Sequence, residues 1–314
     1  MKLFETRQIL VEELQQKTID ILIATASWEC RAVFAPKLLE DRECVHRIAI
    51  QPASKRFLDV NNNDLQLHMM GYEFRQAAEG DREFPRNLMD ELMQSMQGST
   101  LAVAIDYSCM PMAWYSAFVD YFAESSLDFD QVDVDFIYTP GKFTDLPESQ
   151  LGDSIGPLSN HWHLQFPDRA TALVMDLSCE KGRAQGLAEY ISPMELFAFH
   201  ANGFPDSDFL DVIMENNKGL VEQLRDGGLI AYSLNDLQKV ESKLAALCME
   251  LREKYRVIIM PLGPKPFGLL SLLLSIRLPV VDVWQVESVE QERPIDRIPV
   301  GTAVVYRASF KRAV

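Results

Sequence analysis

The sequence predicts an α/β protein made of two related halves, each a mostly parallel β-sheet with helices on its faces. Short apolar runs alternate along the chain with stretches of helical periodicity. This alternation is typical of βαβ units and therefore of parallel sheets. The same order of elements begins again after residue 168, and several short strings recur in both parts. Such recurrence favours an internal duplication.

In the first half, apolar runs bounded by polar or turn residues predict strands. We expect these strands at residues 19–25, 45–50, 101–105 and 132–138, with a further strand at 161–166. Helical patterns lie between them. We expect helices at residues 4–17, 32–39, 85–96 and 113–123.

In the second half, the same reasoning predicts a similar series. We expect strands at residues 172–175, 195–200, 257–260, 280–286 and 302–307, and a long helix at 237–255. The strand at 257–260 leads into Gly263-Pro264-Lys265-Pro266 and then into an apolar segment that has the character of a buried helix. A strand, a tight turn and a helix in this order form half of a βαβ unit.

Three recurring strings support the duplication, each separated from its counterpart by about 150 residues. Ser27-Trp28-Glu29-Cys30-Arg31 resembles residues 178–183, with one residue inserted, and Phe-Leu-Asp-Val occurs at both 57–60 and 209–212. The turn at 108–111 corresponds to the turn at 263–266. The alternative is that any two α/β domains share such a pattern. We predict two Rossmann-like halves, residues 1–168 and 169–314, that face each other across a cleft.

The composition excludes some classes of function. The chain has 314 residues, of which 47% are hydrophobic and 24% charged, and its net charge is −16. An acidic surface disfavours extended contact with nucleic acid, although a local basic cleft is still compatible with it. The N-terminus lacks the apolar core of a signal peptide, and the longest apolar run is too short to span a bilayer. We therefore expect a cytoplasmic protein that does not bind membranes.

Metal and disulfide sites are not indicated. The five cysteines are widely spaced and form no CxxC pair, so neither a disulfide framework nor a zinc site is predicted. His161 and His163 alternate as they would along a strand. Two histidines without a third ligand make a poor metal site. We expect no metal, and the sequence assigns no cofactor.

Gly263-Pro264-Lys265-Pro266 is the first candidate for a binding site. Ligands of open parallel sheets lie at the carboxyl ends of strands, beside helix N-termini whose free N–H groups attract anions. Gly263 and Lys265 are therefore predicted to contact phosphate or carboxylate. The turn matches neither a Walker A loop nor GxGxxG. The alternative is a structural turn with an exposed lysine.

The second candidate is the Ser-x-Glu-x-Arg pattern, which occurs once in each half. Serines suit helix N-caps and glutamates suit the first turn, and this reading needs no ligand. The functional reading is that the serines and arginines bind an anionic ligand and that the glutamates act as acid or base. The residues concerned are Ser27, Glu29 and Arg31 in the first half and Ser178, Glu180 and Arg183 in the second.

The third candidate is Asp106-Tyr107-Ser108-Cys109-Met110-Pro111, at another predicted strand end. A thiol or hydroxyl at a helix N-terminus can act as a nucleophile. No GxSxG elbow surrounds it, and no histidine has a diagnostic spacing, so a buried, inert Cys109 is the favoured reading. We expect Asp106 to be a ligand contact or general base, and Ser108 to be a ligand contact.

The strand followed by Gly263-Pro264-Lys265 resembles the Gly-x-Lys loop of CARF-type sensor domains, and two fused halves resemble the related SAVED arrangement. Those domains are Rossmann-like and bind cyclic oligonucleotides over their strand ends. The first half departs from the pattern, because Met110 stands where a lysine would be expected. The resemblance implies a role in nucleotide-signalled antiviral defence or stress, exercised through a protein partner.

Three functions stay open at this point. The first is a binding or sensor protein for a phosphorylated, nucleotide-like ligand, held by Lys265, Arg31 and Arg183. The second is a hydrolase or transferase acting on a nucleotide or sugar-phosphate, with Glu29, Asp106 or Glu180 as acid or base. The third is a structural subunit of a larger complex. Fold alone does not choose between them.

Overall fold

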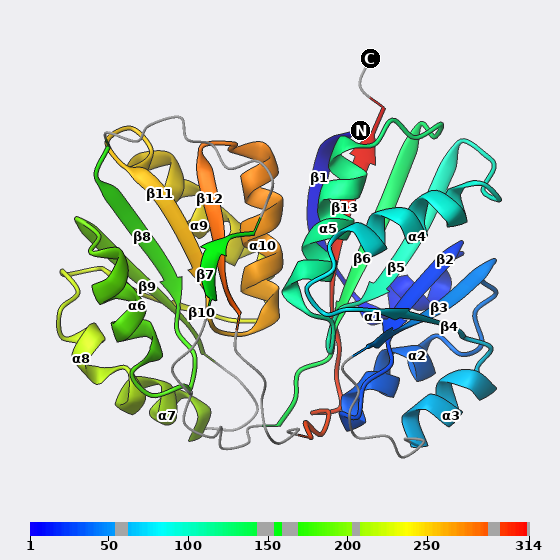
Figure 1. The fold of residues 1–314 in the computed structure, drawn as a ribbon, viewed down its shortest axis with the longest axis horizontal. Helices are drawn as coiled ribbons and strands as arrows, with labels where there is room; N and C mark the ends of the chain where they lie inside the picture. Colours follow the sequence, from blue (N-terminus) through cyan, green and yellow to red (C-terminus); the bar gives the residue numbers. More distant parts are fainter. Residues whose placement is uncertain (54–61, 143–153, 159–168, 203–207, 288–295, 313–314) are drawn as a thin grey trace. The chain divides into compact units, whose positions relative to one another are not determined.

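The computed structural model describes residues 1–53, 62–142, 154–158, 169–202, 208–287 and 296–312. It consists of two compact α/β units (Figure 1). The first unit contains residues 1–142 and 295–314, and the second contains residues 143–294. The second unit is thus inserted into the chain of the first, between that unit's last two strands.

The first unit is built on a seven-stranded sheet with the order β1-β13-β6-β5-β2-β3-β4. Five strands, from β6 to β4, run parallel to their neighbours, whereas β13 is antiparallel to β6 and β1 is antiparallel to β13. The strands are β1 (Lys2–Ile9), β2 (Ile21–Thr25), β3 (His46–Pro52), β4 (Glu73–Ala77), β5 (Thr100–Asp106), β6 (Gln131–Tyr138) and β13 (Val304–Lys311).

Helices cover both faces of this sheet, which is why central strands such as β2 are buried at every position. One face packs against α1, α2 and α3 around Leu14, Leu39 and Leu67. On the other face, α4 packs on α5, whose residues are almost all buried. The helices are α1 (Val11–Gln16), the short 3₁₀ helix η1 (Cys30–Val33), α2 (Phe34–Leu38), α3 (Asn62–Met69), α4 (Glu83–Met93) and α5 (Met112–Glu124).

The second unit is built on a six-stranded sheet with the order β10-β9-β8-β11-β12-β7. The five strands from β10 to β12 are parallel, and β7 is antiparallel to β12. The strands are β7 (Ser154–Pro157), β8 (Thr171–Asp176), β9 (Glu195–Ala201), β10 (Leu229–Tyr232), β11 (Arg256–Pro261) and β12 (Val281–Glu287).

Helices again cover both faces of the second sheet. Leu173, Met175 and Ile258 pack against the side that carries α6, α7 and α8. On the other side α9 packs on α10, and α10 is apolar nearly all round because it is buried. The helices are α6 (Arg183–Ile191), α7 (Asp208–Asn216), α8 (Lys218–Val221), α9 (Leu237–Leu251) and α10 (Lys265–Arg277).

The two sheets share one strand order. Numbered along the chain within each unit, the five parallel strands lie in the order 3-2-1-4-5 in both, as in Rossmann folds. Each sheet then carries an antiparallel strand beside the fifth. Ser116 in α5 and Ser271 in α10 are both buried, and each hydroxyl donates to a main-chain carbonyl one turn earlier. The structure confirms the predicted two-half Rossmann-like α/β fold.

The predicted elements differ from the structure in several places. Residues 2–9 form edge strand β1 rather than the start of a helix, because they pair antiparallel with β13. The short, partly exposed strands β4 and β10 were not predicted. The strand predicted at residues 302–307 belongs to the first sheet, so the compact units divide the chain differently from the predicted halves 1–168 and 169–314. The strand predicted at 161–166 and the string at 57–60 lie outside the described residues.

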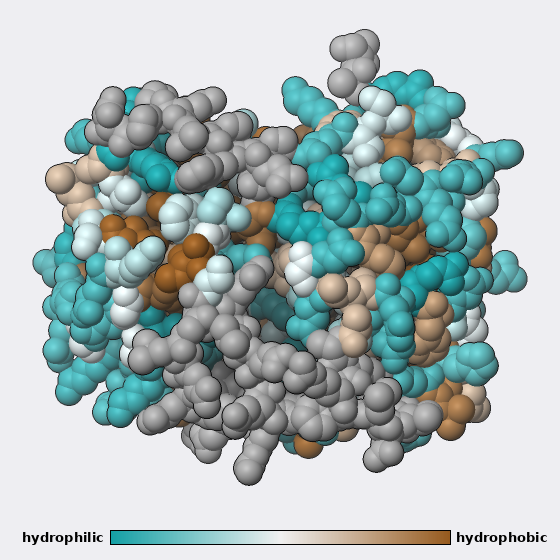
Figure 2. Space-filling model, viewed as in Figure 1, coloured by the Kyte–Doolittle hydropathy of each residue, from teal (hydrophilic) through white to brown (hydrophobic). Residues whose placement is uncertain are grey.

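The outer surface agrees with the acidic composition. Hydrophilic side chains cover most of the described surface of both units on the face shown in Figure 2, with small apolar patches between them. Within the described ranges, no helix has both the length and the apolarity needed to cross a membrane.

Candidate functional site

Each sheet has one point at which its strand order reverses. In the first unit this point lies between β2 and β5, and in the second between β8 and β11, because the connections from these neighbouring strands lead to opposite sides of the sheet. Open α/β sheets bind ligands at this point, outside the carboxyl ends of the strands. The candidate residues predicted from the sequence lie between the carboxyl ends of β2, β5, β8 and β11 and the first turns of the helices that follow them.

In the first unit, the loop after β2 is folded around Ser27. The Ser27 hydroxyl accepts the N–H of Glu29 at 3.3 Å. The buried amide of Asn63, at the start of α3, donates to the carbonyl oxygens of Ser27 and Glu29 at 3.0 and 2.9 Å. The Asn63 amide therefore holds the loop in place through its main chain. Ser27 acts in a local turn and does not cap a helix, because η1 begins at Cys30 without a side-chain cap.

Glu29 and Arg31 form a buried ion pair beside this loop. Arg31 Nε lies 2.7 Å from Glu29 Oε2, and the two side chains are only 4% and 9% exposed. Arg31 also donates to the carbonyl of Thr139 at 3.2 Å and lies over the ring of Tyr138. Burial lowers the pKa of Arg31, but Cys109, Tyr138 and Glu29 more than offset this, so the pKa is raised above its ordinary value. Arg31 is therefore protonated, and these contacts hold its side chain in place.

The segment at residues 296–300 also reaches this loop. Arg297 lies 3.4 Å from the second Glu29 oxygen, and Asp296 accepts the N–H of Cys30 at 2.7 Å. The Cys30 thiol also donates to Asp296, which raises the pKa of that thiol, as burial does to a smaller extent. Arg31, the arginine of this loop that was predicted to bind phosphate, therefore contacts a carboxylate of its own chain, that of Glu29.

Asp106 and Ser108 lie at the end of β5, in the same unit. The Ser108 hydroxyl and N–H both donate to one Asp106 oxygen, and the hydroxyl accepts the N–H of Thr139 at 2.8 Å. Both side chains are buried, at 2% and 0% exposure. They link the ends of β5 and β6. Their contacts therefore indicate a role in holding the backbone in place.

In the second unit, the loop after β8 repeats the pattern of the first. The Ser178 hydroxyl accepts the N–H of Glu180 at 3.2 Å, and the Asn217 amide donates to the Ser178 carbonyl at 2.8 Å. Arg183, at the start of α6, is paired with Glu180. Here the side chains of arginine and glutamate are 12% and 20% exposed, so this pair is more open to solvent than its counterpart.

Gly263 lies against Asp176, the last residue of β8. A Cβ at position 263 would lie 2.2 Å from an Asp176 oxygen, so only glycine fits there. The Gly263 N–H and the Tyr232 hydroxyl, the latter at 3.0 Å, both donate to Asp176. Burial raises the pKa of Asp176 well above its ordinary value, although both hydrogen bonds act in the opposite direction. Gly263 was predicted to contact an anionic ligand, but its N–H already donates a hydrogen bond to Asp176.

Lys265 is the first residue of α10 and is partly exposed. Pro264 caps α10 just as Pro111 caps α5, and in both helices the third residue after the capping proline donates its N–H to that proline's carbonyl at 3.1 Å. By this match the counterpart of Lys265 is Met112. Met110, the counterpart expected from the sequence, is fully buried and corresponds to Gly263.

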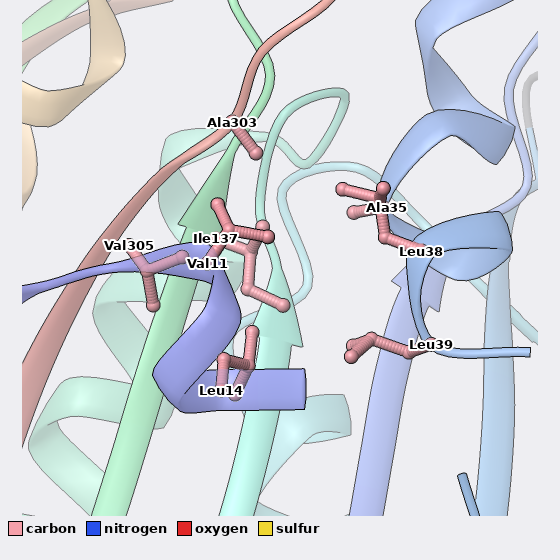
Figure 3. A pocket seen from close by; sticks show the side chains of 8 residues that line it. All are labelled: Val11, Leu14, Ala35, Leu38, Leu39, Ile137, Ala303 and Val305. Carbon is pink, nitrogen blue, oxygen red and sulfur yellow. The ribbon is translucent and has the colours of Figure 1, made fainter. Parts of the chain in front are cut away.

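Other possible sites contribute little to this picture. No group of metal-ligating side chains occurs among the described residues, and His161 and His163 lie outside them. One small pocket in the first unit is wholly apolar and has no room for a water molecule (Figure 3). It belongs to the core and is lined by Val11, Leu14, Ala35, Leu38, Leu39, Ile137, Ala303 and Val305.

The structure brings the predicted residues together within each unit. Ser27, Glu29 and Arg31 share one loop, and Ser178, Glu180 and Arg183 share its counterpart. Sequence reasoning assigned no role to the buried Asp176 or to the pair Asp296 and Arg297 at these strand ends. It read the segments of Asn63 and Asn217 as shared structure rather than shared chemistry, and both asparagines hold a loop. The signal for the asparagines was present, because both follow the repeated Phe-Leu-Asp-Val string at a similar distance.

No protein-family model matches this chain, and comparison with curated proteins finds no relative. The functional argument therefore rests on the fold, the geometry of the site and the sequence resemblance of the Gly-x-Lys loop.

Proposed function

We propose that this protein is a binding or sensor protein for a phosphorylated, nucleotide-like ligand, held at the strand ends of its second unit. One observation carries the proposal. The strand order reverses between β8 and β11, and the loop after β8 carries Ser178, while Arg183 and Lys265 are the first residues of the helices that follow these two strands. Lysine and arginine side chains beside a helix N-terminus suit a phosphate group.

The ligand class follows from the charges and from the sequence resemblance. A partly exposed lysine at the start of a 13-residue helix offers a point charge to a phosphate. The resemblance of the Gly-x-Lys loop to CARF and SAVED domains makes a cyclic oligonucleotide the first ligand to test. A place in a nucleotide-signalled defence or stress pathway, with a protein partner that carries the effector activity, belongs to the same proposal.

The enzyme alternative has less support from the contacts of its candidate residues. Glu29 is held by two arginines, Asp106 by Ser108, and Glu180 by Arg183. A general acid or base must exchange its proton with a substrate, and a carboxylate that is already held in a salt bridge, or by donors of its own loop as Asp106 is, does so poorly. Turnover of an added nucleotide would favour the enzyme, and co-purification of a basic protein without any small ligand would favour a structural subunit.

Calorimetric titration of the pure protein tests the proposal. The ligands are ATP, AMP and a series of cyclic oligonucleotides, each at matched ionic strength, and the bound material from purification is read by mass spectrometry. We expect at least one of these ligands to bind and to be recovered unchanged. If none binds at millimolar concentration and none is carried through purification, the proposal is wrong.

A further inference from the structure

The first unit holds two arginines against one carboxylate of its own chain. Arg31 Nε lies 2.7 Å from one oxygen of Glu29, and an Arg297 nitrogen lies 3.4 Å from the other. Arg31 is buried, whereas the Arg297 side chain is 34% exposed. Guanidinium groups that converge on one anion in this way are typical of phosphate and carboxylate recognition.

A second carboxylate of the chain accepts a hydrogen bond from a main-chain N–H of the same loop. Asp296, which is exposed, accepts the Cys30 N–H at 2.7 Å. The main-chain N–H of Arg31 donates to the Arg297 carbonyl at 3.3 Å, so the two segments lie against each other. Glu29 and Asp296 together occupy the donors that would meet an anionic ligand at this strand end.

We propose that Arg31, Arg297 and the Cys30 N–H form an anion site for a phosphoryl group, and that Glu29 and Asp296 fill this site in the ligand-free chain. A phosphorylated ligand enters by displacing the two carboxylates, because adding its charge to theirs beside two arginines is unfavourable. We call this the Glu29 site. It goes beyond the proposed function, since it lies in the other unit and does not depend on which ligand the second unit binds.

Binding of a ligand at the Glu29 site would also affect the residues that follow Asp296 and Arg297 in the chain. Asp296 and Arg297 directly precede residues 298–300, which pair with residues 140–142. The Lys142 N–H donates to the Ile298 carbonyl at 2.8 Å, and the Val300 N–H donates to the Pro140 carbonyl at 3.1 Å. Release of Asp296 from Cys30, together with displacement of Glu29 from Arg297, removes two of the contacts that hold this segment. Binding at the Glu29 site is therefore expected to loosen the contact between the two places where the chain leaves and re-enters the first unit.

The test compares anion binding by a variant with an emptied site and by a charge-matched control. E29Q/D296N removes both carboxylates, and E40Q/D41N removes the same charge from exposed positions. Inorganic pyrophosphate is titrated by calorimetry against sodium chloride at equal ionic strength, with K265A added to every protein so that the second-unit site does not contribute. We expect E29Q/D296N to bind pyrophosphate about tenfold more tightly than the control, and R297A to abolish this gain.

D296N alone provides a second test that does not depend on folding of the Glu29 variant, because it keeps the Glu29–Arg31 pair. In D296N, pyrophosphate is expected to slow amide hydrogen exchange at Cys30 and Arg31. In the protein that carries K265A alone, saturating pyrophosphate is expected to speed exchange at Lys142 and Val300. The proposal is overturned if E29Q/D296N binds no better than the control, if its gain survives R297A, or if D296N shows no protection. Since K265A is present throughout, failure here leaves the second-unit proposal intact.

Discussion

The strand ends of the two units are built from the same parts but place their charges differently. Both have a serine turn braced by a buried asparagine, followed by a glutamate–arginine pair. In the first unit the pair is almost fully buried and the helix after the fourth parallel strand starts with Met112. In the second the pair is more exposed and the matching helix starts with Lys265.

This comparison distinguishes the contacts that the duplicated fold requires from the contacts that a binding site adds. The serine and asparagine bonds occur in both units, so they belong to the architecture of the loop. The burial of Glu29 against two arginines occurs in one unit, and the lysine at the helix start occurs in the other. We therefore expect substitution of the glutamate–arginine pair to cost more stability in the first unit, and substitution of the first residue of the helix to affect ligand binding more in the second.

The largest expected effect is on the buried pair. Glu29→Gln leaves the guanidinium of Arg31 without its main counter-charge, and we expect the free energy of unfolding of the first unit to fall by about 3 kcal/mol. Glu180→Gln, at the more exposed pair, should cost about 1 kcal/mol or less. Urea denaturation, with hydrogen exchange to report each unit separately, measures both. Equal losses would show that the two pairs are equivalent after all.

A smaller but still large effect is expected at Gly263. Gly263→Ala places a methyl group 2.2 Å from an Asp176 oxygen and 2.8 Å from the Leu177 carbonyl. The overlap should destabilise the second unit by about 2 kcal/mol. Thermal or urea unfolding measures the loss.

Gly186 in α6 provides the matched control for that substitution. Among the described residues, no atom outside the backbone of α6 itself lies within 4 Å of a Cβ at this position, so Gly186→Ala should be neutral or stabilising by up to about 1 kcal/mol. If Gly263→Ala is as well tolerated as Gly186→Ala, the close packing of Gly263 on Asp176 is not a constraint.

Asp176 should give a smaller, pH-dependent effect that has no counterpart at Thr25, the matching last residue of β2. Burial raises the pKa of Asp176 in the folded chain above its ordinary value of 3.8. The folded state then binds the proton more tightly than the unfolded state, so this residue makes stability fall as pH rises from its unfolded pKa toward the folded one. The slope is at most about 1.4 kcal/mol per pH unit.

Asp176→Asn removes that titration. Urea midpoints of the wild type and the variant, measured across this range, should converge or cross as pH rises, because only the wild type loses stability through Asp176. Parallel curves would mean that the carboxyl has the same pKa in the folded and unfolded chains.

Much of the fold follows from local patterns. Strands β2, β5, β6, β8, β9, β11 and β12 were expected within a few residues of their observed bounds. Among them β2, β5, β8 and β11 are nearly continuous apolar runs, because both faces of each sheet are covered. The edge strand β1 and the short strands β4 and β10 lack this signal. The pairing of β13 with the first sheet is a long-range contact that no local pattern encodes.

For the site, the sequence predicts positions better than roles. It places Ser27, Arg31, Ser178 and Arg183 at strand ends, where the structure has them. It does not foresee that Arg31 is held by Glu29, or that Arg297 comes from the far end of the chain to join them. Ion pairs and hydrogen bonds depend on distances in space, and residues 29 and 297 become neighbours only through the sheet order.

Ligand binding by two single variants tests the contrast between the units most directly. The ligand is whichever nucleotide or cyclic oligonucleotide the wild-type protein binds in calorimetric titration. Lys265→Ala removes the charge at the start of α10, and Met112→Ala truncates its counterpart at the start of α5. If the second unit holds the phosphate, Lys265→Ala should weaken binding about tenfold, and Met112→Ala should change it less than about twofold. Equal effects of the two substitutions, or unchanged binding by Lys265→Ala, would contradict a ligand site at the strand ends of the second unit.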